Sequence, residues 1–272
     1  MTEGKQTIGV RLRVFVPFAC GYFLSYLYRV VNSVIAPNLV DDIGVDPSEL
    51  GLLTSAYFIT FAAAQLPLGV LLDRFGPRKI EAFLLAFAGI GAWVFAEAET
   101  LTGLVAGRAL IGFGVSACLM AAFKAYVIWY PREQLPLING YQMAAGGLGA
   151  LAATAPVEAA LAITDWRGVF MALAVLTLVI AALVFFMVPE RAVAGRELSF
   201  GEQVRGIKSV FSSLVFWRIA PWTTLSQASF LSIQGLWAGP WLRDVAGFDR
   251  DQVAGTLSLV AVAMVSGFIL LG

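Results

Sequence analysis

The 272-residue chain contains no histidine. This absence excludes Ser-His-Asp and Cys-His catalysis, histidine metal sites and histidine proton relays. The two cysteines, Cys20 and Cys118, lie within apolar stretches, which favours two reduced core thiols over a disulfide or a metal site. The apolar stretches also hold no paired carboxylates, so the sequence disfavours an enzyme and indicates no metal or other cofactor.

Charge is also scarce. Charged residues make up 13% of the chain, whereas a soluble domain typically has about 25%. Hydrophobic residues make up 59%, and the mean hydropathy is +0.82. This composition leaves too little polar surface to cover a soluble globule, so the expected surroundings are a lipid bilayer. The net charge is zero, which gives no indication of nucleic-acid binding.

Long apolar runs recur along the whole chain. A membrane-spanning helix needs about 20 apolar residues, and eight stretches meet or approach this length. They predict an all-α integral membrane protein. The expected spans are Val14–Pro37, Leu50–Leu72, Ile80–Ala96, Leu101–Tyr130, Leu137–Ile163, Val169–Val188, Phe216–Val245 and Gln252–Gly272.

One connection differs from the short turns between the other stretches. It runs from Pro189 to about Phe211 and is rich in charged residues. The chain is therefore expected to have three parts: a six-helix amino-terminal bundle over 1–189, a linker over 190–212, and a partial carboxyl-terminal bundle of two helices over 213–272.

Basic residues are unevenly distributed between alternate connections. They precede the first span, follow the second and fill the linker, whereas carboxylates follow the first and third spans. Because basic loops stay on the cytoplasmic side, the amino terminus and the linker are predicted to be cytoplasmic. The expected location is a bacterial inner membrane or a plasma membrane. Arg167, Arg243 and Arg250 are exceptions to this pattern.

The connection after the second span carries a recognisable motif. Its glycine, acidic and basic positions are Gly69, Asp73, Arg74, Gly76, Arg78 and Lys79. They resemble the hallmark loop G-x-L-x-D-R-x-G-x-R-[KR] of the major facilitator superfamily. Two weaker motifs of that family are Arg108-x-x-x-Gly112-x-Gly114 and Trp166-Arg167-x-x-Phe170.

The resemblance implies a secondary transporter whose hallmark loop latches a cytoplasmic gate. Asp73 would accept hydrogen bonds from a helix amino terminus, and the basic residues would face anionic headgroups. The alternative is a basic loop that only sets orientation. Family members have twelve helices in two halves, so this chain is expected to be a fragment or truncated product of an incomplete twelve-helix fold.

The first span carries a polar stripe. Its members lie three, four or seven residues apart, so they share one helix face: Tyr22, Ser25, Tyr26, Arg29, Asn32 and Ser33. We expect this face to line a substrate cavity with Arg29 directed into it, because arginine suits paired contacts with carboxylate or phosphate. The alternative is a structural Arg29 neutralised by helix ends or Glu158.

This span also resembles that of the organophosphate:phosphate antiporter branch, in which the matching arginine binds the substrate's anionic group. That branch has a second binding arginine in its seventh helix, and the interior of the expected span Phe216–Val245 holds no arginine to match it. An organic anion is therefore predicted rather than an organophosphate.

Three further charges lie within expected spans. Arg108 is either a coupling residue, as the resemblance implies, or a tie to neighbouring carbonyls. Lys124 either lines the cavity or extends to the membrane surface. Glu158 is taken as the one carboxylate clearly inside a span, serving as a counter-ion or a proton-coupling site. Gln227 and Gln234 are candidates for the opposite cavity wall or for helix packing.

These observations predict a secondary carrier for a small organic anion that works by alternating access. Coupling to protons and coupling to a counter-anion both stay open, and the sequence does not give the oligomeric state. The alternatives are a drug or neutral-solute exporter of the same superfamily and a truncated membrane protein that does not transport.

Overall fold

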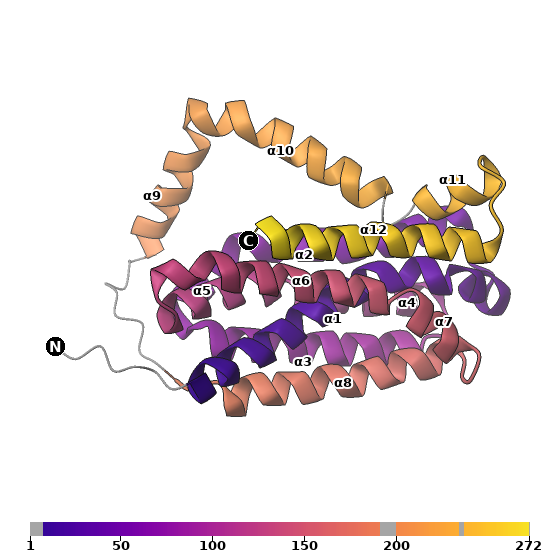
Figure 1. The fold of residues 1–272 in the computed structure, drawn as a ribbon, viewed down its shortest axis with the longest axis horizontal. Helices are drawn as coiled ribbons and strands as arrows, with labels where there is room; N and C mark the ends of the chain where they lie inside the picture. Colours follow the sequence, from indigo (N-terminus) through magenta and orange to yellow (C-terminus); the bar gives the residue numbers. More distant parts are fainter. Residues whose placement is uncertain (1–7, 191–199, 234–236, 272) are drawn as a thin grey trace. The chain divides into compact units, whose positions relative to one another are not determined.

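The computed structural model describes residues 8–190, 200–233 and 237–271. These residues form helices and connections without a strand, which confirms the expected all-α fold (Figure 1). The chain divides into two compact units, Met1–Val193 with Ser258–Gly272, and Ala194–Leu257. The helices of the first 190 residues are α1 (Ile8–Ile43), α2 (Pro47–Phe75), α3 (Pro77–Ala96), α4 (Leu101–Gly114), α5 (Cys118–Trp129), η1 (Arg132–Gln134), α6 (Leu135–Ala152), α7 (Ala155–Leu161) and α8 (Trp166–Met187).

Six helical segments of the described chain are long and apolar enough to cross a membrane. They overlap the first six expected spans: Gly9–Ile43, Pro47–Phe75, Pro77–Ala96, Leu101–Trp129, Arg132–Leu161 and Trp166–Met187.

Two of these spans are interrupted, which the sequence analysis did not predict. The fourth consists of α4 and α5, separated at Val115–Ala117, and the fifth consists of α6 and α7, separated at Ala153–Thr154. The first interruption leaves the carbonyl of Ser116 available, and Nε2 of Gln65 on α2 donates to it at 3.0 Å. A side chain from a neighbouring helix thus supplies the bond that the broken ladder lost.

Residues at the helix ends explain where α2 and α3 begin. Asp46 caps α2 in a capping box: its side chain accepts from the backbone of Glu49, whose carboxylate accepts from the backbone of Asp46. Gly76 separates α2 from α3 with φ of 80°, a conformation that glycine adopts without strain. Pro77 then occupies the first turn of α3.

Glycines bring the helices of the bundle close together. A Cβ at Gly146 of α6 would fall 2.6 Å from the Tyr22 ring on α1, and one at Gly149 would overlap the Phe23 carbonyl. A Cβ at Gly107 of α4 would fall 2.7 Å from Phe95 on α3. These positions leave room for no side chain larger than glycine, so α6 packs closely on α1 and α4 packs closely on α3.

The rest of the described chain is also helical. The segments are α9 (Phe200–Phe211), α10 (Leu214–Ser232), α11 (Ala238–Asp244) and α12 (Arg250–Leu271). The expected seventh span, Phe216–Val245, contains most of α10 and all of α11, and residues 234–236 lie outside the described residues. The three-part division into 1–189, 190–212 and 213–272 stays a prediction.

Candidate functional site

Arg29 lies near the middle of α1 among aromatic side chains. Its guanidinium carbon is 4.5 Å from the ring centre of Tyr26 and 5.4 Å from that of Phe61 on α2. Tyr57 and Tyr22 are further electrostatic neighbours. Within the described part of the chain, no carboxylate pairs with Arg29, and its buried Nε has no hydrogen-bond partner. The alternative that helix ends or Glu158 neutralise Arg29 stays a prediction.

The rest of the polar stripe is largely buried against other helices. The Tyr22 ring packs edge-on against Tyr26 with 5.2 Å between ring centres, and its hydroxyl donates to the sulfur of Met143 on α6. Nδ2 of Asn32 donates to Thr54 on α2 at 3.3 Å. Ser25 is buried, and its carbonyl accepts from the Tyr57 hydroxyl. Ser33 is exposed and bonds only to its own helix. The stripe thus holds α1 to α2 and α6 as well as surrounding Arg29.

Arg108 on α4 is fully buried. Its Nη1 donates to the carbonyl of Tyr28 on α1 at 2.9 Å, and its guanidinium carbon lies 4.8 Å from the Tyr57 ring centre. This contact is the tie to a neighbouring carbonyl that the sequence analysis named as one alternative. The coupling role stays a prediction.

The hallmark loop makes contacts within the bundle that the sequence did not indicate. Asp73, near the end of α2, forms an ion pair with Lys124 on α5. Lys124 thus pairs with a carboxylate, a role that neither of its predicted alternatives included. Asp73 was expected to accept from a helix amino terminus, and here its partner is a side chain.

The basic residues of the loop also have protein partners. Arg78 donates to the carbonyl of Val188 at 3.2 Å and pairs with Glu190 at 3.5 Å, and Lys79 pairs with Glu190. The hydrogen bond from Lys79 lowers the pKa of Glu190 below its usual value. Arg74 is exposed and lies beside the Phe75 ring, and no atom is close to the Cβ position of Gly69 or Gly76. Among the basic residues of this loop, Arg74 alone forms no ion pair with another described residue, so it is the one free to face lipid headgroups.

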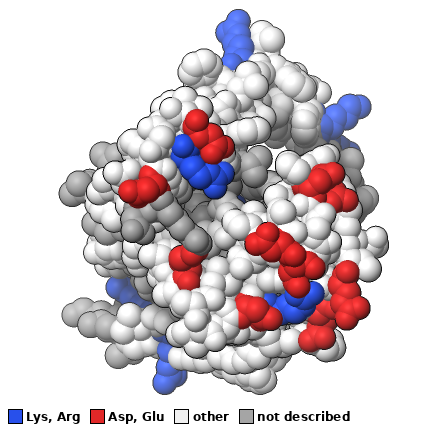
Figure 2. Space-filling view, turned by 90° about the vertical axis from the view of Figure 1, so that its right-hand side faces the viewer, with Lys and Arg blue, Asp and Glu red and all other residues white. Residues whose placement is uncertain are grey.

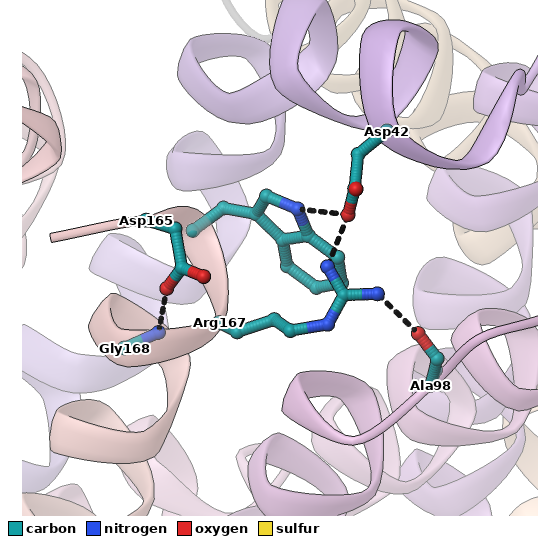
Figure 3. A network of polar contacts seen from close by, with 6 residues as sticks. Asp42, Ala98, Asp165, Arg167 and Gly168 are labelled. Carbon is teal, nitrogen blue, oxygen red and sulfur yellow. Dashed lines mark hydrogen bonds and ion pairs between the residues drawn. The ribbon is translucent and has the colours of Figure 1, made fainter.

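At the opposite end of the bundle, Trp166 and Arg167 bind one carboxylate. Asp42 of α1 accepts from Nε1 of Trp166 at 3.2 Å and from Arg167, and Arg167 donates to the carbonyl of Ala98 at 3.1 Å (Figure 3). Arg167, an exception to the loop charge pattern, is therefore neutralised locally. Asp and Glu side chains predominate in the space-filling view of this end (Figure 2).

Comparisons with known proteins identify the family. The family model described as "Major Facilitator Superfamily" matches residues 18–272. The chain belongs to the major facilitator superfamily. This is a family of membrane transporters rather than enzymes, as the sequence predicted, and with six candidate spans the chain is a multi-pass membrane protein.

Relatives within the superfamily cover most of this chain. It is 27% identical over 280 residues to the "Probable sulfoacetate transporter SauU" of Cupriavidus necator, covering 97% of this chain and 64% of that protein. It is 21% identical over 266 residues to the "Hexuronate transporter" of Escherichia coli, covering 92% and 61%. The chain thus spans less than two thirds of these relatives' length.

A solved structure of the superfamily has the same fold. The proton:xylose symporter XylE bound to 6-bromo-6-deoxy-D-glucose matches with a TM-score of 0.72 at 16% identity, covering 95% of this chain and 68% of that one. At this identity the match concerns the fold alone.

The remaining site predictions in this superfamily member are placed as follows. Glu158 lies in the short helix α7 and is partly exposed. Gln227 is exposed on α10, in the second compact unit. Gln234 lies outside the described residues. The roles assigned to these three residues stay predictions.

Sequence reasoning missed one buried charge. Glu81 of α3 is fully buried, so Glu158 is not the one carboxylate inside a span. Glu81 is the second residue of the expected span Ile80–Ala96 and directly follows the basic residues of the loop. The signal for it is this position inside the span.

Proposed function

We propose that the protein is a secondary transporter for a small organic anion, with Arg29 as the residue that binds the anionic group. The supporting observation is that Arg29 lies within a span and pairs with no carboxylate in the described chain. A mid-membrane arginine costs at least about 2.5–3.5 kcal/mol. The cation–π contacts with Tyr26 and Phe61 offset this cost, but they supply no negative charge, which a bound anion would provide.

The relatives support an anionic substrate. The names of the two relatives described above specify sulfoacetate and hexuronate, which are organic anions at neutral pH. The rings of Tyr26 and Phe61 lie beside the guanidinium, whose planar fork suits paired contacts with carboxylate or sulfonate oxygens. Asn32, Ser25, Gln227 and Gln234 are proposed as further polar contacts.

Transport by alternating access is part of the same proposal, with the hallmark loop as a gate element. The ion pair of Asp73 and Lys124 connects the end of α2 to α5. The pair is partly exposed to solvent: the side chain of Asp73 is 60% exposed and that of Lys124 is 19% exposed. A pair this exposed adds at most about 1 kcal/mol to stability. Its loss should therefore affect conformational exchange more than folding.

The expected result for Asp73→Asn is slower turnover with unchanged substrate affinity, because a weakened gate contact alters the balance between two conformations. Counterflow rates and binding isotherms in reconstituted vesicles measure the two quantities. Lys124→Gln should have the same effect, and exchanging the two charges should restore part of the rate. Unchanged turnover in both single variants would count against this role.

The proposed orientation places the amino terminus and the hallmark loop in the cytoplasm. The end with Asp41, Asp42, Glu97 and Glu99 has carboxylates on its surface, whereas Arg74, Arg78 and Lys79 lie at the other end. Basic residues are retained on the cytoplasmic side.

A thermal-shift screen of the purified chain tests the substrate class. We expect small carboxylates or sulfonates to raise the melting temperature while uncharged sugars and cationic compounds do not, because bound ligand stabilises the folded state by mass action. Stabilisation by uncharged or cationic compounds alone would instead favour the exporter alternative.

A further inference from the structure

Glu81 is a carboxyl group enclosed by the bundle. It lies four residues after Pro77, so it is about 6 Å along the axis from the start of α3. The residue is 0% exposed, and neither carboxyl oxygen has a hydrogen-bond partner in the described chain. Oε1 of Glu81 lies against Gly21 of α1, so close that a Cβ atom on Gly21 would clash with it. The absence of a side chain at Gly21 provides the space for the carboxyl group.

The surroundings of Glu81 supply no cation. Its electrostatic neighbours are Cys118 and Tyr126 of α5. The Tyr126 hydroxyl donates to Gln142 of α6 rather than to Glu81. The basic groups that neighbouring elements carry have partners elsewhere: Arg78 and Lys79 at Glu190, Lys124 at Asp73, Arg108 at Tyr28 and Arg167 at Asp42.

A carboxylate in such a site would lack both a counter-ion and hydrogen-bond donors. Burying an unpaired charge costs far more than burying a neutral acid, so the group takes up a proton. The remaining charged and titratable groups on the elements packed against α3 are Arg11, Arg13, Cys20, Tyr22, Tyr26, Tyr28, Arg29 and Asp41 on α1, and Glu49, Tyr57 and Arg74 on α2.

This site lies near the proposed anion site. Oε1 of Glu81 lies against Gly21, which is eight residues from Arg29 on α1, or about 12 Å along the helix axis. Cys118 is an electrostatic neighbour of both Glu81 and Arg29. An anion bound at Arg29 would repel an ionised Glu81 and would leave a protonated Glu81 undisturbed. Anion binding and protonation therefore favour each other, and the effect is reciprocal.

We propose that Glu81 is a proton-binding site and that its proton accompanies the anion held by Arg29. The coupling rests on the proposed function, whereas the proton site stands independently of it. Glu81 lies close to the end of the bundle that bears Asp73 and Lys124. The proton is released to water at that end when the bundle changes conformation.

Infrared spectroscopy of the reconstituted chain tests the proton site without any substrate. A protonated carboxyl group has a carbonyl stretching band that a carboxylate lacks. At neutral pH we expect such a band, its persistence in Glu158→Gln, and its loss in Glu81→Gln. A spectrum of Glu81→Gln identical to that of the unmodified chain would overturn the proton site.

A second variant covers the case in which Glu81→Gln does not insert. The methyl group of Gly21→Ala would contact Oε1 of Glu81, so it should shift the band without removing it. An unshifted band would place the protonated group elsewhere and overturn the assignment.

Anion binding at two pH values tests the coupling. From mildly alkaline to mildly acidic pH, we expect affinity for the stabilising anion to rise about tenfold, and Glu81→Gln to bind equally well at both. An unchanged pH dependence in Glu81→Gln would overturn the coupling. If the infrared band behaves as expected but no anion binds, the proton site stands and the proposed function fails.

Discussion

The Arg29→Ala variant is expected to bind the stabilising anion about a hundredfold more weakly than the unmodified protein. Two charge-assisted hydrogen bonds from one guanidinium are worth about 2.7 kcal/mol together, which corresponds to this factor. The thermal shift with that anion should disappear at concentrations that saturate the native protein. Calorimetric titration and uptake into vesicles measure the same loss directly.

Two variants separate the anion site from a general effect of charge. Arg29→Lys keeps the charge but not the planar fork, so it should retain weak binding and lose selectivity for carboxylate or sulfonate. Arg13→Ala removes an exposed arginine from the start of the same helix, and its affinity should be unchanged. Full affinity in Arg29→Ala would rule out this residue as the anion ligand.

The Gly149→Val variant is expected to lose the folded bundle. The first added atom would overlap the carbonyl oxygen of Phe23, a backbone atom that cannot move without displacing α1. Overpacking of this kind costs about 1–3 kcal/mol, or more where the backbone must shift. The yield of monodisperse protein in detergent and its melting temperature are the quantities to measure.

A matched glycine substitution gives the control. Gly51 lies on α2 with no atom within 4 Å of its Cβ position, so Gly51→Ala should leave the melting temperature nearly unchanged. If Gly149→Val melts at the same temperature as Gly51→Ala, α1 and α6 are not packed at this glycine.

Hydropathy predicted the first six spans well because each is a continuous apolar run bounded by turn residues such as Pro47 and Gly76. Hydropathy did not reveal the interruption at Val115–Ala117, because a continuous helix and a broken helix can have the same apolar sequence. What permits the break is Gln65, which is distant in sequence and donates to Ser116. Such partners come from tertiary packing.

The candidate site was predictable where it lies on one helix. The period of the polar stripe placed Tyr22, Tyr26 and Arg29 on a common face, and the structure places both tyrosines beside Arg29. The partner of Lys124 was not predictable, because Asp73 is 51 residues away. The burial of Glu81 depends on Gly21 of another helix and was equally hidden.

The contact of Asp42 with Arg167 has a consequence for biosynthesis. The two residues are 125 positions apart, so the carboxylate emerges from the ribosome long before its partner. At about 5–20 residues per second, the interval is roughly 6–25 s. Throughout that time α1 must remain in the membrane with an unpaired acidic end, which water at the interface can solvate. The first helix is therefore inserted long before its contact with Arg167 can form. The six-helix bundle cannot complete its packing until the sixth span has been translated.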